Sequence, residues 1–315
     1  MAEFDLIQRY FTQLTASRED TRLGIGDDCA LLSVPAGYEL ATSTDTLVAG
    51  VHFFDDVAAD SLGHKSLAVN LSDLAAMGAD AAWVTLALTL DRTDPAWLQD
   101  FSRGFAALAA EFNVQLVGGD TTQGPLSICI TALGLVPVGQ ALKRSAAKVG
   151  DLVCVTGQLG DAALALRALQ GDPRAEPFLR ELRHRLERPQ PRLAAGQALR
   201  GLAHAAIDLS DGLISDLGHI LKQSGVGATL QLAELPLSPQ LHRYRQSDDS
   251  FALPLAGGDD YELCVTLPPA KLAEAQQAIA DLTVIGQIDA RPGMRLQRQD
   301  GSLLEQPLSG YEHFL

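Results

Sequence analysis

Basic side chains are scarce in this chain of 315 residues, and lysine is the scarcest of them. The sequence holds 5 Lys and 19 Arg against 27 Asp and 12 Glu, so the formal net charge is −15. So acidic a chain repels phosphate backbones and anionic lipid headgroups, which disfavours a protein that binds nucleic acid or membrane surfaces. The excess of Asp over Glu indicates turns, helix caps or metal sites, because the short Asp side chain keeps its oxygens near the backbone.

Long apolar runs are also missing. The longest apolar stretches, VTLALTL and ICITALGLVPV, have the length of strands and fall short of the roughly 18 residues that a membrane-spanning helix needs. The N-terminal segment carries Glu3 and Asp5 where a secretory signal would carry Lys or Arg. We therefore expect a cytoplasmic protein that does not associate with membranes.

Cysteine is rare and scattered. The four cysteines are Cys29, Cys129, Cys154 and Cys264, and the sequence has no CxxC pair and no Cys/His cluster. This spacing favours reduced structural thiols over disulfides or a zinc site.

Two halves of the chain each alternate strand-like and helix-like segments. A polar break, KRSAAKVGD, separates them at 143–151 and predicts domains over 1–142 and 143–315. In the first half Pro35-Ala36-Gly37 predicts a turn between two paired strands, and Asp94-Pro95 predicts the start of a helix. The alternation is typical of a layered α/β fold.

Six segments place Asp beside Gly, Ser or Thr at a strand end or a turn. They are GIGDD, STDT, NLSD, GGDTT, DLSDG and GGDDYE. Each segment alone is most often a turn or a helix cap. Together they predict carboxylates that converge, because strand ends in α/β folds tend to gather at one crevice.

Converging carboxylates require a cation. Two such charges about 5 Å apart repel by roughly 3 kcal/mol at an effective dielectric constant near 20. Oxygen ligands without a Cys or His cluster favour Mg²⁺, Mn²⁺ or Ca²⁺ over zinc, and the absence of a DxDxDG loop argues against a calcium protein. Mg²⁺ shares phosphate oxygens readily, so Asp clusters beside Gly-rich turns indicate a nucleotide polyphosphate.

The common phosphate-binding motifs are absent. No Gly-Lys dipeptide occurs, which excludes a Walker A loop, and GQLGDA at 157–162 lacks the third glycine of a dinucleotide fingerprint. The kinase HRD and DFG motifs and the GxSxG elbow are missing as well.

Seven separated segments resemble, in order, those of the thiamine-monophosphate kinase family, within the ATP-binding superfamily of aminoimidazole ribonucleotide synthetase. They are LGIGDDCALL, STDTLVAGVHF, KSLAVNLSDLAAMGA, LVGGDTT, AIDLSDGLISDLGHI, LAGGDDYEL and GYEHF, and they span the whole chain. The resemblance implies an N-terminal ferredoxin-like α/β domain that binds ATP and Mg²⁺ and forms a homodimer. It also implies a C-terminal α/β domain that completes the metal and substrate site, and transfer of the ATP γ-phosphoryl group to thiamine phosphate as the last step of thiamine diphosphate biosynthesis.

The resemblance also implies roles for individual residues. Several Mg²⁺ ions would be held by Asp28, Ser43, Thr44, Asp45, Asp73, Asp120, Asp208 and Asp211. Of these, the residues expected to act in catalysis are Asp28, Asp45, Asp120 and Asp211. ATP would contact Gly119, Asp120, Arg144 and Ser210, and thiamine phosphate would contact His52, Asp259 and Tyr311.

Plainer interpretations of three of these residues remain open. His52 could be a half-buried residue at a strand end, Arg144 a solvated charge, and Tyr311 an anchor for the C-terminus. The family motif has Glu where this chain has Asp259, one methylene shorter, which leaves a direct or a water-mediated substrate contact open. RSAAKVGD likewise stands where the family more usually has RSGAKPGD.

Two other functions compete with phosphorylation of a phosphate. One is a superfamily synthetase that phosphorylates an amide or a selenide, although residues 1–21 lack the Cys and Lys of a selenophosphate synthetase. The other is a non-catalytic sensor of metal or nucleotide, which the same Asp clusters could serve.

Overall fold

The computed structural model describes residues 3–247, 250–304 and 310 of the chain. The chain forms two compact units, each described here by itself. Unit 1 comprises Met1–Leu74 and Ala79–Gly139, and unit 2 comprises Ala75–Gly78 and Gln140–Leu315. The boundary expected at 142/143 stays a prediction.

Unit 1 is built from a four-stranded sheet, a short two-stranded ribbon and three helices. Its elements are α1 Glu3–Tyr10, β1 Thr21–Leu23, β2 Leu31–Leu32, β3 Tyr38–Val48, α2 Ala59–Ala76, β4 Asp80–Leu90, α3 Pro95–Glu111, β5 Gln115–Gln123 and β6 Ser127–Pro137. The strand order in the sheet is β3-β6-β4-β5, with β4 and β5 parallel and the other pairs antiparallel. Strands β3 and β5 are therefore the two edges of the sheet.

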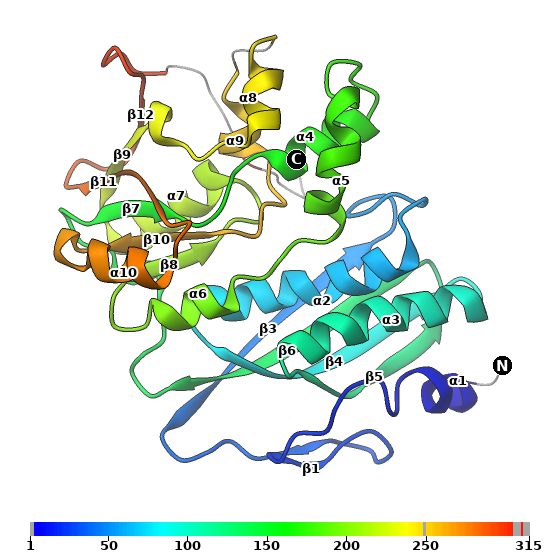
Figure 1. Ribbon diagram of the computed structural model, residues 1–315. Coiled ribbons are helices and arrows are strands. Elements are labelled where there is room, and N and C mark those ends of the chain that lie inside the picture. Colours follow the sequence, from blue (N-terminus) through cyan, green and yellow to red (C-terminus); the bar gives the residue numbers. More distant parts are fainter. Residues whose placement is uncertain (1–2, 248–249, 305–309, 311–315) are drawn as a thin grey trace. The chain divides into compact units, whose positions relative to one another are not determined.

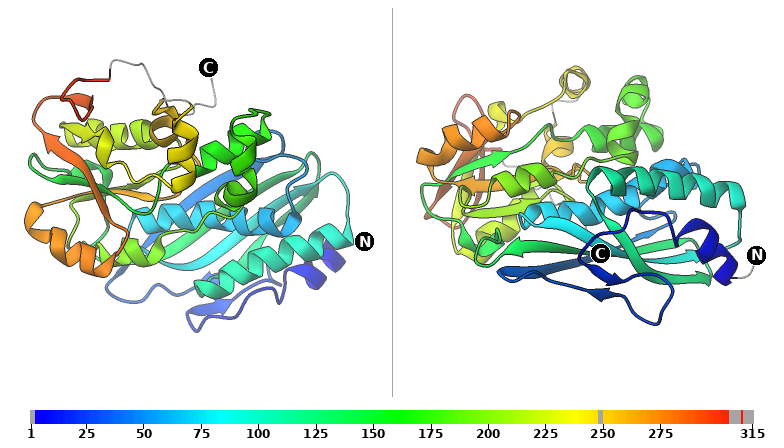
Figure 2. Two further views of the ribbon diagram at one scale, coloured as in Figure 1. Left: turned by 45° about the horizontal axis from the view of Figure 1, so that its top comes forward. Right: turned by 60° about the horizontal axis from the view of Figure 1, so that its bottom comes forward.

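Helices α2 and α3 lie side by side on one face of this sheet, as the views in Figure 1 and Figure 2 agree. They approach closely at Gly104, where an added Cβ would lie 1.8 Å from the carbonyl oxygen of Asp60. Helix α3 begins as the sequence predicts: the Asp94 carboxylate accepts hydrogen bonds from the backbone N–H of Ala96 and Trp97, and Pro95 is the first helical residue.

The strands on either side of Pro35-Ala36-Gly37 do not pair with each other. Strand β2 pairs with β1, and β3 pairs along its whole length with β6, with Tyr38 opposite Pro137 and Val48 opposite Ser127. The expected hairpin is therefore wrong. An eleven-residue partner offers β3 far more ladder hydrogen bonds than the two-residue β2 can.

Unit 2 contains a six-stranded sheet of order β12-β9-β11-β7-β10-β8, in which β12 and β9 are parallel and the other strand pairs among the described residues are antiparallel. Its strands are β7 Leu152–Val155, β8 Ala205–Asp208, β9 Gly227–Gln231, β10 Leu263–Leu267, β11 Thr283–Asp289 and β12 Gly293–Gln297. Its α-helices are α4 Asp161–Leu169, α5 Leu179–Glu187, α6 Leu193–Ala198, α7 Leu213–Ser224, α8 Pro239–Arg245, α9 Ala252–Ala256 and α10 Leu272–Ala278. Four 3₁₀ turns lie between them: η1 Arg144–Ala146, η2 Glu176–Phe178, η3 Leu232–Glu234 and η4 Pro269–Lys271.

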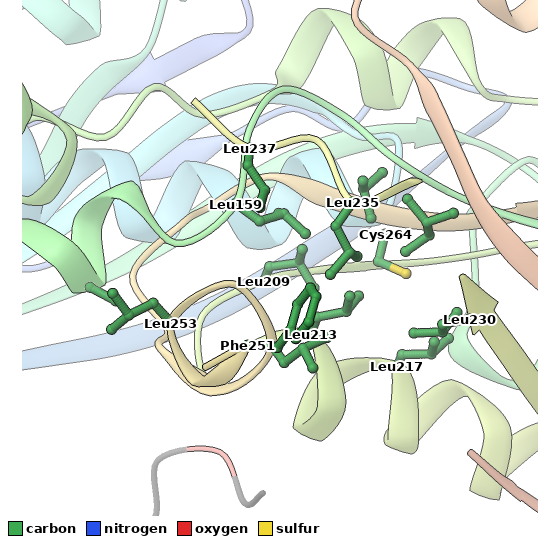
Figure 3. Close-up of a cluster of buried hydrophobic side chains, with 14 of the residues drawn as sticks. Leu159, Leu209, Leu213, Leu217, Leu230, Leu235, Leu237, Phe251, Leu253 and Cys264 are labelled. Carbon is green, nitrogen blue, oxygen red and sulfur yellow. The ribbon is translucent and has the colours of Figure 1, made fainter. Parts of the chain in front are cut away.

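A cluster of buried apolar side chains packs between this sheet and its helices. Leu209, Leu213 and Leu217 enter it from the β8–α7 segment, and Cys264 enters it from β10 (Figure 3). Both Cys154 and Cys264 are fully buried thiols, and burial raises the pKa of the Cys154 thiol to about 12. The β8–α7 connection is thus anchored on both sides by apolar packing.

The two-domain α/β architecture expected from the sequence is confirmed. Among the described residues, no helix has both the length and the apolar character needed to cross a membrane.

Candidate functional site

In unit 1, helix α2 presents two polar side chains to the edge strand β3. The Asn70 side-chain oxygen accepts a hydrogen bond from the Asp45 backbone N–H at 3.0 Å, and the Ser43 hydroxyl donates to the Asp73 carboxylate. Residues 70 and 73 are neighbours on one helix face, and residues 43 and 45 share one face of the strand. The structure therefore brings Ser43, Asp45 and Asp73 together.

Thr44 lies between Ser43 and Asp45 on β3, so its side chain points to the opposite face of the strand. Its hydroxyl oxygen is 2.8 Å from that of Thr131 on β6. The Thr44 side chain therefore does not join the group around Asp45.

Gly119 and Asp120 lie on β5, at the other edge of the same sheet. Asp45 is opposite Ile130, Ile130 is opposite Leu86, and Leu86 is opposite Gly119. Three interstrand spacings of about 4.8 Å separate β3 from β5, or roughly 14 Å along the sheet. Within unit 1, Asp45 and Asp120 thus lie on opposite edge strands, and the common crevice expected from the sequence stays a prediction.

Gly119 occupies a position that only glycine fits. Its φ is +151°, and an added Cβ would lie 1.9 Å from the carbonyl oxygen of Leu86 on β4. The glycine before Asp120 therefore allows the close approach of β4 and β5.

Two further residues expected at the site lie in unit 1. Asp28 is exposed in the segment before β2, and its backbone N–H donates to the Asp27 carboxylate at 2.9 Å. His52 is half-buried in the turn after β3, where its Nδ1 accepts from the backbone N–H of Val48 at 3.0 Å. That bond holds the neutral ring in the tautomer with its proton on Nε2.

In unit 2, the DLSDG segment connects β8 to α7. Asp208 is the last residue of β8, and the Asp216 carboxylate accepts from the backbone N–H of Asp211 and Gly212, each at 3.1 Å. Burial, and then the nearby charges of Asp208 and Asp211, raise the pKa of Asp216 to about 7. Asp208 and Asp211 therefore lie close enough for their charges to oppose the ionisation of Asp216.

Sequence reasoning assigned no role to Asp216. The available signal was its position: Asp216 is a carboxylate in the first turn of the helix that follows DLSDG, where an acidic side chain often caps the backbone N–H groups.

The GGDDYE segment runs beside DLSDG. The Asp259 N–H donates to the Ser210 carbonyl oxygen at 2.9 Å, and the Tyr261 N–H donates to that of Leu209 at 2.8 Å. Asp208, Ser210, Asp211 and Asp259 are consequently held on two adjoining segments of one unit.

Arg144 is exposed in η1. Its carbonyl oxygen accepts from the Ser224 hydroxyl, which in turn accepts from the Ala147 N–H, so the backbone around Arg144 is tied to the end of α7. Tyr311 lies outside the described residues.

The donor chemistry of these residues fits a hard cation, since the expected ligands are carboxylates and hydroxyls. In the part of the chain that the structure describes, no three His, Cys, Asp or Glu side chains form a group that could hold a metal ion.

Comparisons with known proteins cover nearly the whole chain. The family described as AIR synthase related protein, N-terminal domain, matches residues 26–136, and the corresponding C-terminal domain family matches residues 148–299. The thiamine-monophosphate kinase of Escherichia coli K12 is 50% identical over 321 residues, covering 99% of this chain and 98% of the relative.

Two solved structures share the fold. The thiamine-monophosphate kinase of Stenotrophomonas maltophilia K279a has a TM-score of 0.87 and 46% identity over 96% of this chain and 98% of that one. AaThiL, solved in complex with AMPPCP and TMP, has a TM-score of 0.79 and 29% identity over 89% of each chain. By its sequence and by its fold, the chain belongs to the thiamine-monophosphate kinase family.

Proposed function

We propose that this chain phosphorylates thiamine phosphate with ATP, producing thiamine diphosphate and ADP. The observation that carries the proposal is the 50% identity with a thiamine-monophosphate kinase over 99% of the chain. The complex of AaThiL with AMPPCP and TMP supports the choice of ATP and thiamine phosphate as the two substrates.

The acceptor phosphate explains why no general base is required. An oxygen of a phosphate monoester is already anionic near neutral pH, so it can attack the γ-phosphorus without losing a proton to a side chain. The new P–O bond forms as the bond between the γ-phosphorus and the β,γ-bridging oxygen breaks, which releases ADP. The difficulty of the reaction is therefore the repulsion between two anionic phosphates held in line.

We assign the task of relieving that repulsion to Mg²⁺ ions and to Arg144. Mg²⁺, when bound, would neutralise phosphate charge, and its proposed ligands are Asp28, Ser43, Thr44, Asp45, Asp73, Asp120, Asp208 and Asp211. Thr44 would contribute its backbone carbonyl oxygen, because its hydroxyl faces Thr131. Asp208 and Asp211 lie near enough to Asp216 for their charges to help raise its pKa, and a cation bound beside them would offset that repulsion. Gly119, Asp120, Arg144 and Ser210 are the proposed contacts of ATP, and His52, Asp259 and Tyr311 those of thiamine phosphate.

An assay of ATP consumption with and without thiamine phosphate tests the proposed activity. ADP should form only when thiamine phosphate is present, and only with Mg²⁺ or Mn²⁺. ADP formation that does not depend on thiamine phosphate would favour another synthetase of the superfamily. Nucleotide binding without turnover would favour a sensor.

Two variants test the proposed ligands. Asp45→Asn and Asp211→Asn should each lower turnover by at least about 100-fold, as loss of a charge-stabilising group commonly does. Asp100→Asn removes a carboxylate from the exposed surface of α3, where Asp100 pairs with Arg103, and should leave turnover unchanged. Near-normal turnover of both site variants would contradict the assignment.

We also propose that the chain forms a homodimer and that it is located in the cytoplasm. Tyr38 and Leu40, two exposed apolar side chains on one face of the edge strand β3, form a surface that a second copy would cover. Four free cysteines, two of them fully buried, suit a reducing compartment that also supplies ATP.

A further inference from the structure

The GGDDYE segment holds two non-glycine residues in the left-handed region of backbone space. Asp259 has φ 59° and Tyr261 has φ 48°. This conformation is unfavourable for residues that carry a Cβ, and more so for a bulky residue such as Tyr than for Asp. Such strain persists only where the surroundings over-determine it.

The residues that alternate with these two are buried carboxylates with specific partners. Asp260 is 7% exposed, and its two carboxylate oxygens accept from the Gly160 N–H at 2.9 and 3.1 Å. Glu262 is 2% exposed. Each strained residue is therefore followed directly by an anchored one.

Glu262 receives four hydrogen bonds from three residues. The Thr156 hydroxyl donates at 2.8 Å, Arg192 donates from Nε at 2.5 Å and from Nη2 at 3.0 Å, and Arg185 donates from Nη2 at 3.0 Å. Two guanidinium groups compensate the buried charge, and a charge buried without such partners would be strongly destabilising. The carboxylate thus fixes the end of the GGDDYE segment to α5, to the start of α6 and to the end of β7.

The GGDDYE segment is also joined to the DLSDG segment by backbone hydrogen bonds. Besides the bonds from Asp259 and Tyr261, the Leu209 N–H donates to the Glu262 carbonyl oxygen at 2.8 Å. A shift of GGDDYE would therefore move the backbone of residues 209 and 210 as well.

We propose that Asp260 and Glu262 are positioning residues that hold Asp259 in its left-handed conformation and so direct its side chain to thiamine phosphate. This inference rests on the proposed function, in which Asp259 contacts that substrate. Without the two anchors the segment would relax toward ordinary backbone angles, and the Asp259 side chain would point elsewhere. Of the four proposed ATP contacts only Ser210 lies on the coupled DLSDG segment, so ATP binding should change less.

Glu262→Gln tests this proposal because it keeps the size of the side chain and removes its charge. The KM for thiamine phosphate should rise at least about tenfold, and the KM for ATP should change by less than about threefold. Glu187→Gln makes the same chemical change at an ion pair with Arg183 on α5 and should leave both values unchanged.

The decisive comparison repeats Glu262→Gln in an Asp259→Ala background. If Glu262 acts through Asp259, the second substitution should add less than about twofold to the KM for thiamine phosphate, because interacting sites are not additive. An equal increase in both backgrounds would overturn the proposal and leave Glu262 a general structural residue. So would an unchanged KM in Asp259→Ala alone.

Arg185→Gln provides a milder variant should Glu262→Gln fail to fold. This variant removes one hydrogen-bond donor to Glu262 and leaves the pair with Arg192 in place. We therefore expect the KM for thiamine phosphate to rise about threefold, and we expect no such rise in the Asp259→Ala background. A wild-type protein that does not convert thiamine phosphate would contradict the proposed function itself, whereas activity with additive effects contradicts only the positioning role.

Discussion

At the scale of single residues, Asp259 combines a proposed substrate contact with an unfavourable backbone angle. Because glycine adopts φ 59° without steric cost, Asp259→Gly should be more stable than Asp259→Ala by about 1 kcal/mol. Thermal unfolding of the two variants measures the difference. Ala107→Gly in the middle of α3 is the control, where glycine should instead lower stability by about 1 kcal/mol. An Asp259→Gly variant less stable than Asp259→Ala would show that the angle is not strained.

Asp161 predicts a dependence of stability on pH. Its carboxylate is buried at the start of α4, where Ser238 donates to it at 2.5 Å, and burial raises the pKa of Asp161 above its ordinary value. The native state therefore keeps this proton to higher pH than the unfolded chain, so ionisation lowers stability as pH rises from about 4, the unfolded value, through the native pKa. Asp161→Asn has no ionisable group at this position and so escapes that loss. The melting temperature of Asp161→Asn minus that of wild type should therefore be larger at about pH 8 than at about pH 4.

Asp300→Asn is the control of opposite sign. Hydrogen bonds from Ser302 lower the pKa of the exposed Asp300, so its contribution to stability is present above the unfolded pKa and is lost as pH falls. A difference between Asp161→Asn and wild type that does not change with pH would contradict the account of Asp161.

Sequence reasoning placed Asn70 and Glu262 among the polar residues of the motifs without identifying their partners, and it assigned no role to Asp216. Asn70, Asp216 and Glu262 lie inside segments that carry the family resemblance, yet nothing in those segments reveals their partners. Glu262 binds Thr156 and Arg192, which are 106 and 70 positions away. Such contacts depend on the packing of the whole unit, and periodicity along the chain contains no information about them.

At the scale of secondary structure elements, α2 and the edge strand β3 are joined by partly buried hydrogen bonds. Asn70 is 1% exposed and supplies the acceptor for the Asp45 N–H. Asn70→Ala leaves that partly buried donor without this acceptor, and we expect a loss of about 1 kcal/mol in the free energy of unfolding. Chemical denaturation measures the loss. Gln123→Ala removes an exposed side-chain bond to the Asp91 carbonyl and should change stability by less than about 0.5 kcal/mol; equal effects would contradict the account.

Elements with strong local signals were predicted, and elements that depend on distant partners were not. The start of α3 follows from the cap and proline at 94 and 95. The pairing of β3 with β6 joins residues up to 99 positions apart, and the antiparallel order of the unit 2 sheet joins β7 to β10 across more than a hundred residues. Turn residues reveal where a strand ends, but they do not select its partner.

At the scale of the whole molecule, the exposed apolar side chains of Tyr38 and Leu40 on the edge strand β3 predict self-association. Sedimentation at micromolar concentration should show twice the 33.5 kDa chain mass. A stable contact of this kind buries roughly 1,200–2,000 Å². Leu40→Lys should shift the protein toward the monomer, because it places a charge in the contact. Leu303→Lys, at an exposed leucine of unit 2, should leave the mass unchanged. A wild-type monomer with full activity would contradict the proposed dimer.

Transfer of label from γ-labelled ATP tests the central claim most directly. With Mg²⁺ and thiamine phosphate, the label should appear in thiamine diphosphate. Without thiamine phosphate, the chain itself should stay unlabelled, because the acceptor oxygen is a competent nucleophile and no phosphoenzyme is needed. Unphosphorylated thiamine should accept poorly, since its hydroxyl would require a base. Stoichiometric labelling of an Asp that passes its phosphoryl group to the acceptor, or equal use of thiamine and thiamine phosphate, would contradict direct transfer between the two phosphates.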